Sequence, residues 1–120
     1  MIEYDYDEAR GLLRVTASGV LADVDFREAK FPDVPVGTHE LLDTSAVTRV
    51  ELSSAEVRRL AEVDRSGPVR IARMAIVATT AVGFGLARMY QTLSEGDHPA
   101  TEVRVFRDTD SARAWLGLDA

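Results

Sequence analysis

The chain has 120 residues, of which 46% are hydrophobic and 28% charged, a composition typical of one globular domain spanning residues 1–120. A formal net charge of −6 argues against nucleic acid or an anionic membrane as a partner, and the lack of cysteine excludes disulfides, thiolate chemistry and Cys-ligated metal centres. No apolar run approaches the roughly 20 residues that span a bilayer, and Met1 leads directly into a polar segment without a secretory signal. We therefore expect a cytoplasmic protein without membrane insertion.

The N-terminal part of the chain predicts an antiparallel hairpin, with strands at Ile2–Tyr6 and Leu12–Ser18 joined by a polar turn. Apolar and polar residues alternate in the second strand, which predicts that one of its faces is exposed to water. A short helix is expected over Asp23–Phe31, and Pro32 and Pro35 stop it from extending further. The third strand is predicted at His39–Leu42.

The second half of the chain alternates helices with strands. We predict a helix from Ser53 to about Asp64, and a strand at Met74–Ala78 whose uninterrupted apolar run places it at the centre of the sheet. A helix over Ala81–Ser94 follows, then a fifth strand at Thr101–Phe106 and a last helix capped by Asp108. The Ala81–Ser94 helix carries apolar residues at helical spacing: Val82, Leu86, Met89, Tyr90 and Leu93. This order predicts an α/β fold, a mixed sheet of about five strands with an opening antiparallel hairpin and helices packed against it.

That order of elements resembles the STAS and SpoIIAA-like fold of anti-sigma-factor antagonists. Residues Asp43–Val47 (DTSAV) are similar to the D-[LF]-S-x-[VL] motif that follows the third strand in STAS proteins. Residues Gly83–Tyr90 (GFGLARMY) look like the G-L-A-R-M-[FY] helix of small SpoIIAA-like (STAS/SEC14-like) bacterial proteins. The resemblance covers nearly the whole chain and implies a bacterial regulatory domain that acts by protein contact.

The phospho-acceptor serine of the antagonists is the main departure from the family pattern. In those proteins the motif continues into D-S-S-G, and carry-over without a gap places Leu52 at the acceptor position. A shift of one residue would make Ser53 the acceptor, at a helix N-terminus that favours a phosphate. Ser53 and Glu56 also match a capping box, which explains Ser53 without phosphorylation.

Two glycines occupy the first turn of the Ala81–Ser94 helix, after a buried strand, where ligands gather in open sheets. Glycine costs about 1 kcal/mol relative to alanine inside a helix, so we expect Gly83 and Gly85 to permit a close approach. Core packing, a dimer contact and a small ligand are the alternatives. Phe84 and Arg88 are predicted on the outward face, where Arg88 either pairs with Glu95 or another surface carboxylate, or joins Phe84 in a homodimer interface.

Neither metal binding nor catalysis is indicated by motif. His39 and His98 lack further ligands at a recognised spacing, and G-x-S-x-G is absent, so we expect no metal, no cofactor and no enzyme activity. Asp43 ends a buried strand and is a candidate catalytic carboxylate. A turn in which its side chain accepts the amide of Ser45 or Ala46 explains it more simply.

The sequence leads to two function hypotheses. The first is a non-enzymatic SpoIIAA-like protein-interaction domain, a homodimer that makes its contacts through the Ala81–Ser94 helix. The second, implied by the resemblance to SEC14-like lipid binders, is a carrier or sensor of a small apolar or amphipathic ligand. Its pocket would lie between residues 23–31 and the sheet, lined by Phe26, Phe31 and Trp115.

Overall fold

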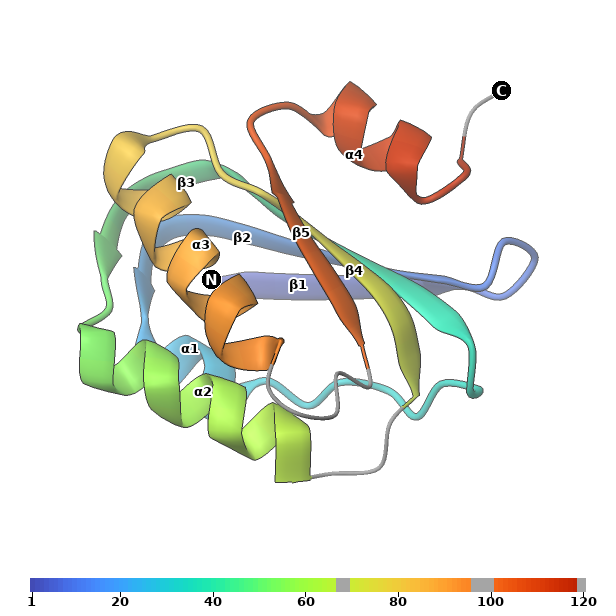
Figure 1. Ribbon diagram of the computed structural model, residues 1–120, viewed down its shortest axis with the longest axis horizontal. Coiled ribbons are helices and arrows are strands. Elements are labelled where there is room, and N and C mark those ends of the chain that lie inside the picture. Colours follow the sequence, from blue (N-terminus) through green and yellow to red (C-terminus); the bar gives the residue numbers. More distant parts are fainter. Residues whose placement is uncertain (67–69, 96–100, 119–120) are drawn as a thin grey trace.

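The computed structural model describes residues 1–66, 70–95 and 101–118, without the side chains of residues 64–66. It contains a five-stranded sheet in the order β1-β2-β3-β4-β5, in which β1 runs antiparallel to β2 and the other pairs are parallel (Figure 1). The strands are β1 (Ile2–Asp7), β2 (Leu12–Ala22), β3 (Thr38–Glu51), β4 (Ile71–Val77) and β5 (Glu102–Phe106). The helices are α1 (Asp23–Glu28), α2 (Ser54–Ser66), α3 (Ala81–Ser94) and α4 (Thr109–Trp115). The predicted mixed sheet with its opening hairpin is thereby confirmed.

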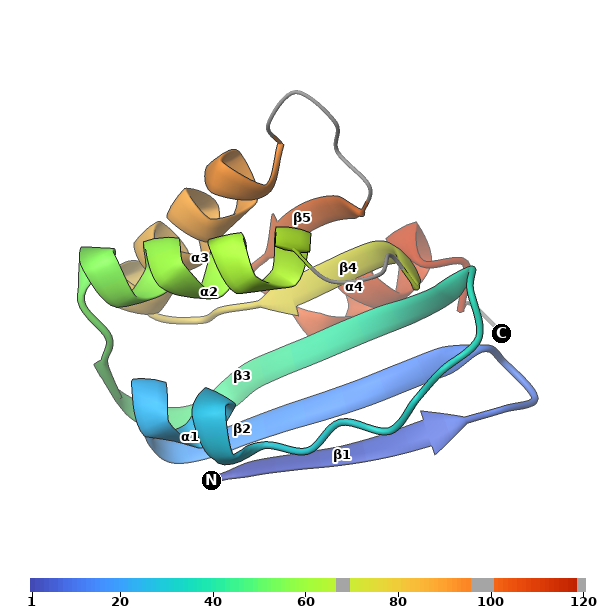
Figure 2. The same cartoon turned by 90° about the horizontal axis from the view of Figure 1, so that it is seen from below.

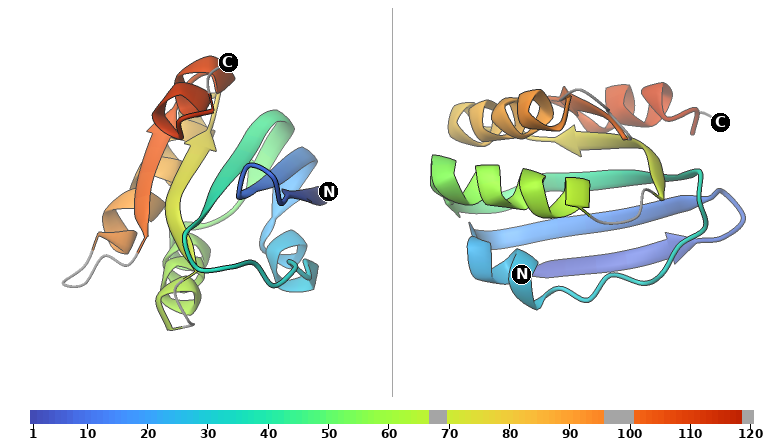
Figure 3. Two further views of the ribbon diagram at one scale, coloured as in Figure 1. Left: turned by 90° about the vertical axis from the view of Figure 1, so that its right-hand side faces the viewer. Right: turned by 60° about the horizontal axis from the view of Figure 1, so that its bottom comes forward.

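Helices cover both faces of the sheet. The α3 helix packs on one face, over a core that includes Leu13, Val15 and Leu42, and α2 lies beside it (Figures 1 and 2). The α4 helix packs on the other face through Ala112 and Leu116, on the opposite side of β5. The α1 and α2 helices lie at the same end of the sheet, because each follows a parallel strand, β2 or β3 (Figure 3).

The β3 strand is much longer than the predicted His39–Leu42, and the DTSAV motif lies within it rather than in a turn. Its register with β2 shifts twice, first where Thr16 and Ser18 pair with Asp43 and Ala46, so that β3 advances three residues while β2 advances two. Such bulges bend a strand without ending it. The predicted end of this strand at Leu42 was wrong, because pairing with the whole of β2 holds the polar residues that follow in extended form. In the observed order β3, not the Met74–Ala78 strand, is central.

The α1 helix ends at Glu28, three residues before the predicted end at Phe31. Ala29 is already extended, with φ −68° and ψ 131°. Pro32 keeps Phe31 out of the helix, because helical backbone is disfavoured in the residue before a proline. Residues 29–37 therefore form an extended connection that runs back along the sheet to β3 (Figure 2).

The α3 helix has the predicted bounds, and its inward face agrees with the prediction at Leu86 and Tyr90 but not at Val82 or Phe84. Ala87 is its buried residue, and Phe84 and Tyr90 pack against the core, whereas Val82 is 64% exposed. Small side chains at Gly83 and Ala87, one turn apart, let the helix lie close to the sheet and turn the neighbouring Val82 outward. The predicted outward position of Phe84 was therefore wrong.

Candidate functional site

An apolar cavity of about 110 Å³ lies between the sheet, α2 and α3, with a contribution from α1. It is lined by Leu21, Phe26, Leu42, Thr44, Val50, Leu52, Val57, Leu60, Met74, Ile76, Ala78, Gly83, Leu86, Ala87 and Tyr90. The one hydroxyl of β3 in this set, that of Thr44, donates to the Val77 carbonyl at 2.6 Å. Its hydrogen-bonding capacity as a donor is therefore already used by the protein.

Gly83 lines the cavity, and the cap of α3 explains why this position is a glycine. Its N–H donates to the Thr80 side-chain oxygen at 3.0 Å, which caps α3, and a Cβ added at Gly83 would lie 2.9 Å from that oxygen. A Cβ added at Gly85 would meet no described atom within 4 Å, and Gly85 is exposed. A close contact therefore requires glycine at position 83, whereas none of the described residues requires it at position 85.

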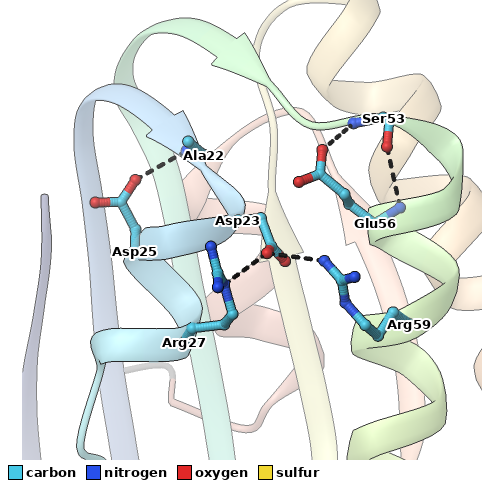
Figure 4. Close-up of polar contacts among 7 residues, drawn as sticks. All are labelled: Ala22, Asp23, Asp25, Arg27, Ser53, Glu56 and Arg59. Atoms are coloured by element: carbon cyan, nitrogen blue, oxygen red, sulfur yellow. Dashed lines mark hydrogen bonds and ion pairs between the residues drawn. The ribbon is translucent and has the colours of Figure 1, made fainter.

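The predicted capping box at the start of α2 is confirmed (Figure 4). The Glu56 N–H donates to Ser53 Oγ at 3.1 Å, and the Ser53 N–H donates to Glu56 Oε1 at 2.9 Å. The hydrogen bond predicted for the Asp43 side chain is present as well, although within β3 rather than in a turn, since Asp43 Oδ1 accepts the Ser45 N–H at 2.9 Å. Both side chains have a structural role, and phosphorylation of the exposed Ser53 stays a prediction.

A charged cluster joins α1 to α2 (Figure 4). Arg27 Nε and Arg59 Nη2 each lie 2.8 Å from Asp23 Oδ2. The Asp23 side chain is 5% exposed, and those of Arg27 and Arg59 are 66% and 56% exposed. Asp23 Oδ1 is buried and has no hydrogen-bond partner among the described residues.

Sequence reasoning missed this cluster. Asp23 and Arg27 stand four residues apart in a predicted helix, a spacing that could have indicated their ion pair. Arg59 lies 36 residues beyond Asp23, and no local pattern connects the two.

The three aromatic residues predicted to line one pocket lie in different places. Phe26 lines the cavity, but Phe31 packs against Tyr4 with ring centroids 5.5 Å apart. Trp115 packs on Phe106 at 5.7 Å, in the core on the other face of the sheet. The cavity is instead completed by aliphatic residues of α2 and α3, such as Leu60 and Leu86.

The outward face of α3 differs from the predicted interface. Phe84 lies beneath Arg107, whose guanidinium carbon is 4.0 Å from the ring centroid. Glu95 accepts a hydrogen bond from Gln91 at 3.2 Å, so the predicted pairing partner of Arg88 is engaged elsewhere. Arg88 itself is exposed, as is Gly85.

Histidine, aspartate and glutamate are absent from the residues that line the cavity in the described part of the chain. Among the described residues, no three His, Asp or Glu side chains are placed to hold a metal ion. His39 has a buried Nδ1 without a hydrogen-bond partner in the described part of the chain, and His98 lies outside the described residues. In those same ranges, none of the helices has the length and apolarity needed to cross a membrane.

No family model and no curated protein sequence matches the chain. Among solved structures, the chain is similar to an uncharacterized protein of the DUF3478 family with a SpoIIAA-like fold from Shewanella loihica PV-4. The two share 17% sequence identity with a TM-score of 0.55, over 97% of this chain and 92% of the other. The fold is therefore SpoIIAA-like, and at this identity the likeness defines the fold alone.

Proposed function

We propose that this domain is a non-enzymatic carrier or sensor that holds a small apolar molecule, or the apolar end of an amphipathic one, in the cavity beneath α2 and α3. The observation that supports this is the lining, which is almost wholly aliphatic and aromatic. Water gains little in such a space because it needs two to four polar partners. An apolar ligand gains both dispersion contacts and release from water.

The size of the cavity limits the ligand. Engineered apolar cavities of about 150 Å³ bind benzene or xenon, whereas drug-sized ligands need roughly 300–1,000 Å³. At about 110 Å³ the cavity suits a single ring or a short alkyl segment. The proposed ligand is therefore small, or it leaves most of its length outside.

The chemistry of the lining favours binding over catalysis. Among the described residues that line the cavity, Tyr90 carries the only ionisable side chain. General acid–base catalysis usually needs at least one group with a pKa near neutrality within reach of the substrate. A wall of hydrocarbon offers no such group, so retention rather than conversion of the ligand is the function we propose.

Titration with benzene, followed by amide NMR shifts, tests this proposal. We expect saturable shifts at cavity residues such as Leu60 and Ala87, and expect Ala87→Leu to abolish them because its side chain fills the cavity. Ala81→Leu is the matched control, since it adds the same side chain on the exposed side of α3. Thermal unfolding of both variants checks that the fold is kept. Absence of saturable shifts in the wild type contradicts the proposal.

Self-association is a second candidate function, favoured by the outer face of α3. Val82 is 64% exposed there, beside Gly85, which has no side chain to hold a partner away. Arg88 and Glu95 lie on the same exposed face. In a two-fold dimer each residue meets its counterpart reciprocally, so two antiparallel α3 helices would place opposite charges together.

A further inference from the structure

We propose that the ligand of the cavity carries an oxoanion, a carboxylate or phosphate, which Arg27 and Arg59 bind at the cavity edge. This inference rests on the proposed function. Each arginine is the chain neighbour of a lining residue: Arg27 follows Phe26 in α1, and Arg59 precedes Leu60 in α2. Neither arginine lines the cavity itself, but both start from backbone next to its wall, and their long side chains meet at Asp23 between the two helices.

Asp23 forms ion pairs with both guanidiniums. They approach the same oxygen, Oδ2, at 2.8 Å each, from two different helices (Figure 4). The carboxylate is almost fully buried, whereas both arginine side chains are more than half exposed. An anion arriving from solvent thus meets guanidinium N–H groups, because Asp23 Oδ1 has no surface open to it.

The charge balance of the cluster favours an anion. Two guanidiniums share one carboxylate, which leaves one positive charge uncompensated within the cluster. Each guanidinium has five N–H donors in a planar fork that matches a carboxylate or phosphate in two parallel hydrogen bonds. Their ion pairs with Asp23 restrict both side chains before a ligand binds, which lowers the entropy cost of binding.

A ligand that satisfies both parts of the site is a small amphiphile with an apolar ring or chain and an anionic head. We choose 3-phenylpropanoate as the probe, because its phenyl ring fits a cavity of this size and its three-carbon chain allows the carboxylate to reach the edge. The neutral comparison is 3-phenylpropan-1-ol, and 3-phenylpropyl phosphate distinguishes a phosphate site from a carboxylate site.

Dissociation constants from amide NMR titrations of the full chain test the inference. We expect Arg59→Gln to weaken binding of the preferred anion by about tenfold, the loss of a charge-assisted hydrogen bond, and to leave the alcohol unaffected. Arg27→Gln on the other helix should act in the same direction. Arg58→Gln is the matched control, since it removes an equal charge from an exposed neighbour in α2 and should change neither constant.

The outcomes separate this inference from the proposed function. If the alcohol and both anions bind equally well, and Arg59→Gln changes none of them, the oxoanion site is wrong while the apolar cavity stands. If none of the three probes binds, the apolar cavity fails and the oxoanion site with it. Arg59→Lys guards against a folding artefact, because it keeps the charge and should retain part of the anion affinity while losing the planar fork.

Discussion

Gly83 and Gly85 share one turn of α3 but have different surroundings. At Gly83 an added methyl group would lie 2.9 Å from the Thr80 oxygen that accepts the Gly83 N–H, so Thr80 would have to rotate and the cap would be lost. At Gly85 the space around the added group is open among the described residues. The higher helix propensity of alanine is therefore offset at Gly83 by loss of the Thr80 cap, whereas nothing offsets it at Gly85 among the described residues.

We expect Gly85→Ala to raise the free energy of unfolding by about 0.5–1 kcal/mol, the usual difference between glycine and alanine in an exposed helix. Gly83→Ala should bring no gain, because loss of an N-cap bond costs about 1 kcal/mol. Urea unfolding of the two single variants measures this difference. An equal gain at both positions would show that Thr80 does not determine the residue at Gly83.

Residue-level roles were predictable where the interaction is local. The capping box joins Ser53 to Glu56, and the Asp43 side chain bonds to the Ser45 N–H, so both interactions span only two or three residues. The order of residues along the chain is enough to predict them. The ion pair between Asp23 and Arg59 spans 36 residues and depends on where α1 and α2 come to lie. Its prediction would have required the tertiary structure.

At the scale of elements, α4 is short enough that its cap matters. It has seven residues, and isolated helices below about 12 residues are marginal in water. Two features hold it: the packing of Ala112 and Leu116 on the sheet, and the Asp108 carboxylate, which accepts the Ser111 N–H at 2.7 Å and the Ser111 hydroxyl at 3.0 Å. The backbone bond and then the hydroxyl bond lower the pKa of Asp108.

This pKa shift predicts a pH dependence of stability. A carboxyl with a lower pKa in the folded state binds fewer protons there than in the unfolded chain, so its contribution is complete above the ordinary aspartate pKa and is lost as pH falls through the folded value. Asp108→Asn keeps a capping oxygen but cannot titrate. We expect the difference in unfolding free energy between wild type and Asp108→Asn to shift against the wild type on acidification. Urea unfolding between pH 3 and pH 7 measures it, and a constant difference contradicts the prediction.

Elements were predictable where periodicity and end signals agree. The α3 helix has an apolar repeat and a capping Thr80, and its bounds match the prediction. The prediction ended the third strand too early, because Asp43, Thr44 and Ser45 favour turns in isolation. Pairing with β2 on one side and β4 on the other overrides that local preference for part of the strand.

At the scale of the whole molecule, the alternation of helices and strands predicted the α/β class, whereas only Phe26 of the three predicted pocket residues lines the cavity. Its wall combines side chains from three strands, three helices and the segments between them, for example Leu21, Val57 and Met74. A cavity is the space that such side chains leave after packing, and its volume depends on small residues such as Ala78 and Ala87 facing large ones. The sequence pattern marks which residues face inward without fixing how well they fill the interior.

The oligomeric state is a property of the whole molecule, and substitutions on the outer face of α3 test it. Phe84→Ala is a poor test of a dimer, because Phe84 packs on the core and its loss would destabilise the monomer as well. Val82→Glu is sharper, since the side chain is 64% exposed and its replacement by a charge leaves the interior untouched. Val63→Glu on α2 is the matched control, with a side chain that is 61% exposed.

If α3 forms a two-fold interface, sedimentation of the wild type should show a dimer, and Val82→Glu should raise the dimer dissociation constant by about tenfold or more, because a charge would be buried in the contact without a partner. Val63→Glu should sediment like the wild type. Because each copy contributes the same α3 face, one substitution acts twice in the dimer and not at all in a monomer. A wild type that stays monomeric up to millimolar concentration, or a Val63→Glu effect equal to that of Val82→Glu, rules out self-association through α3.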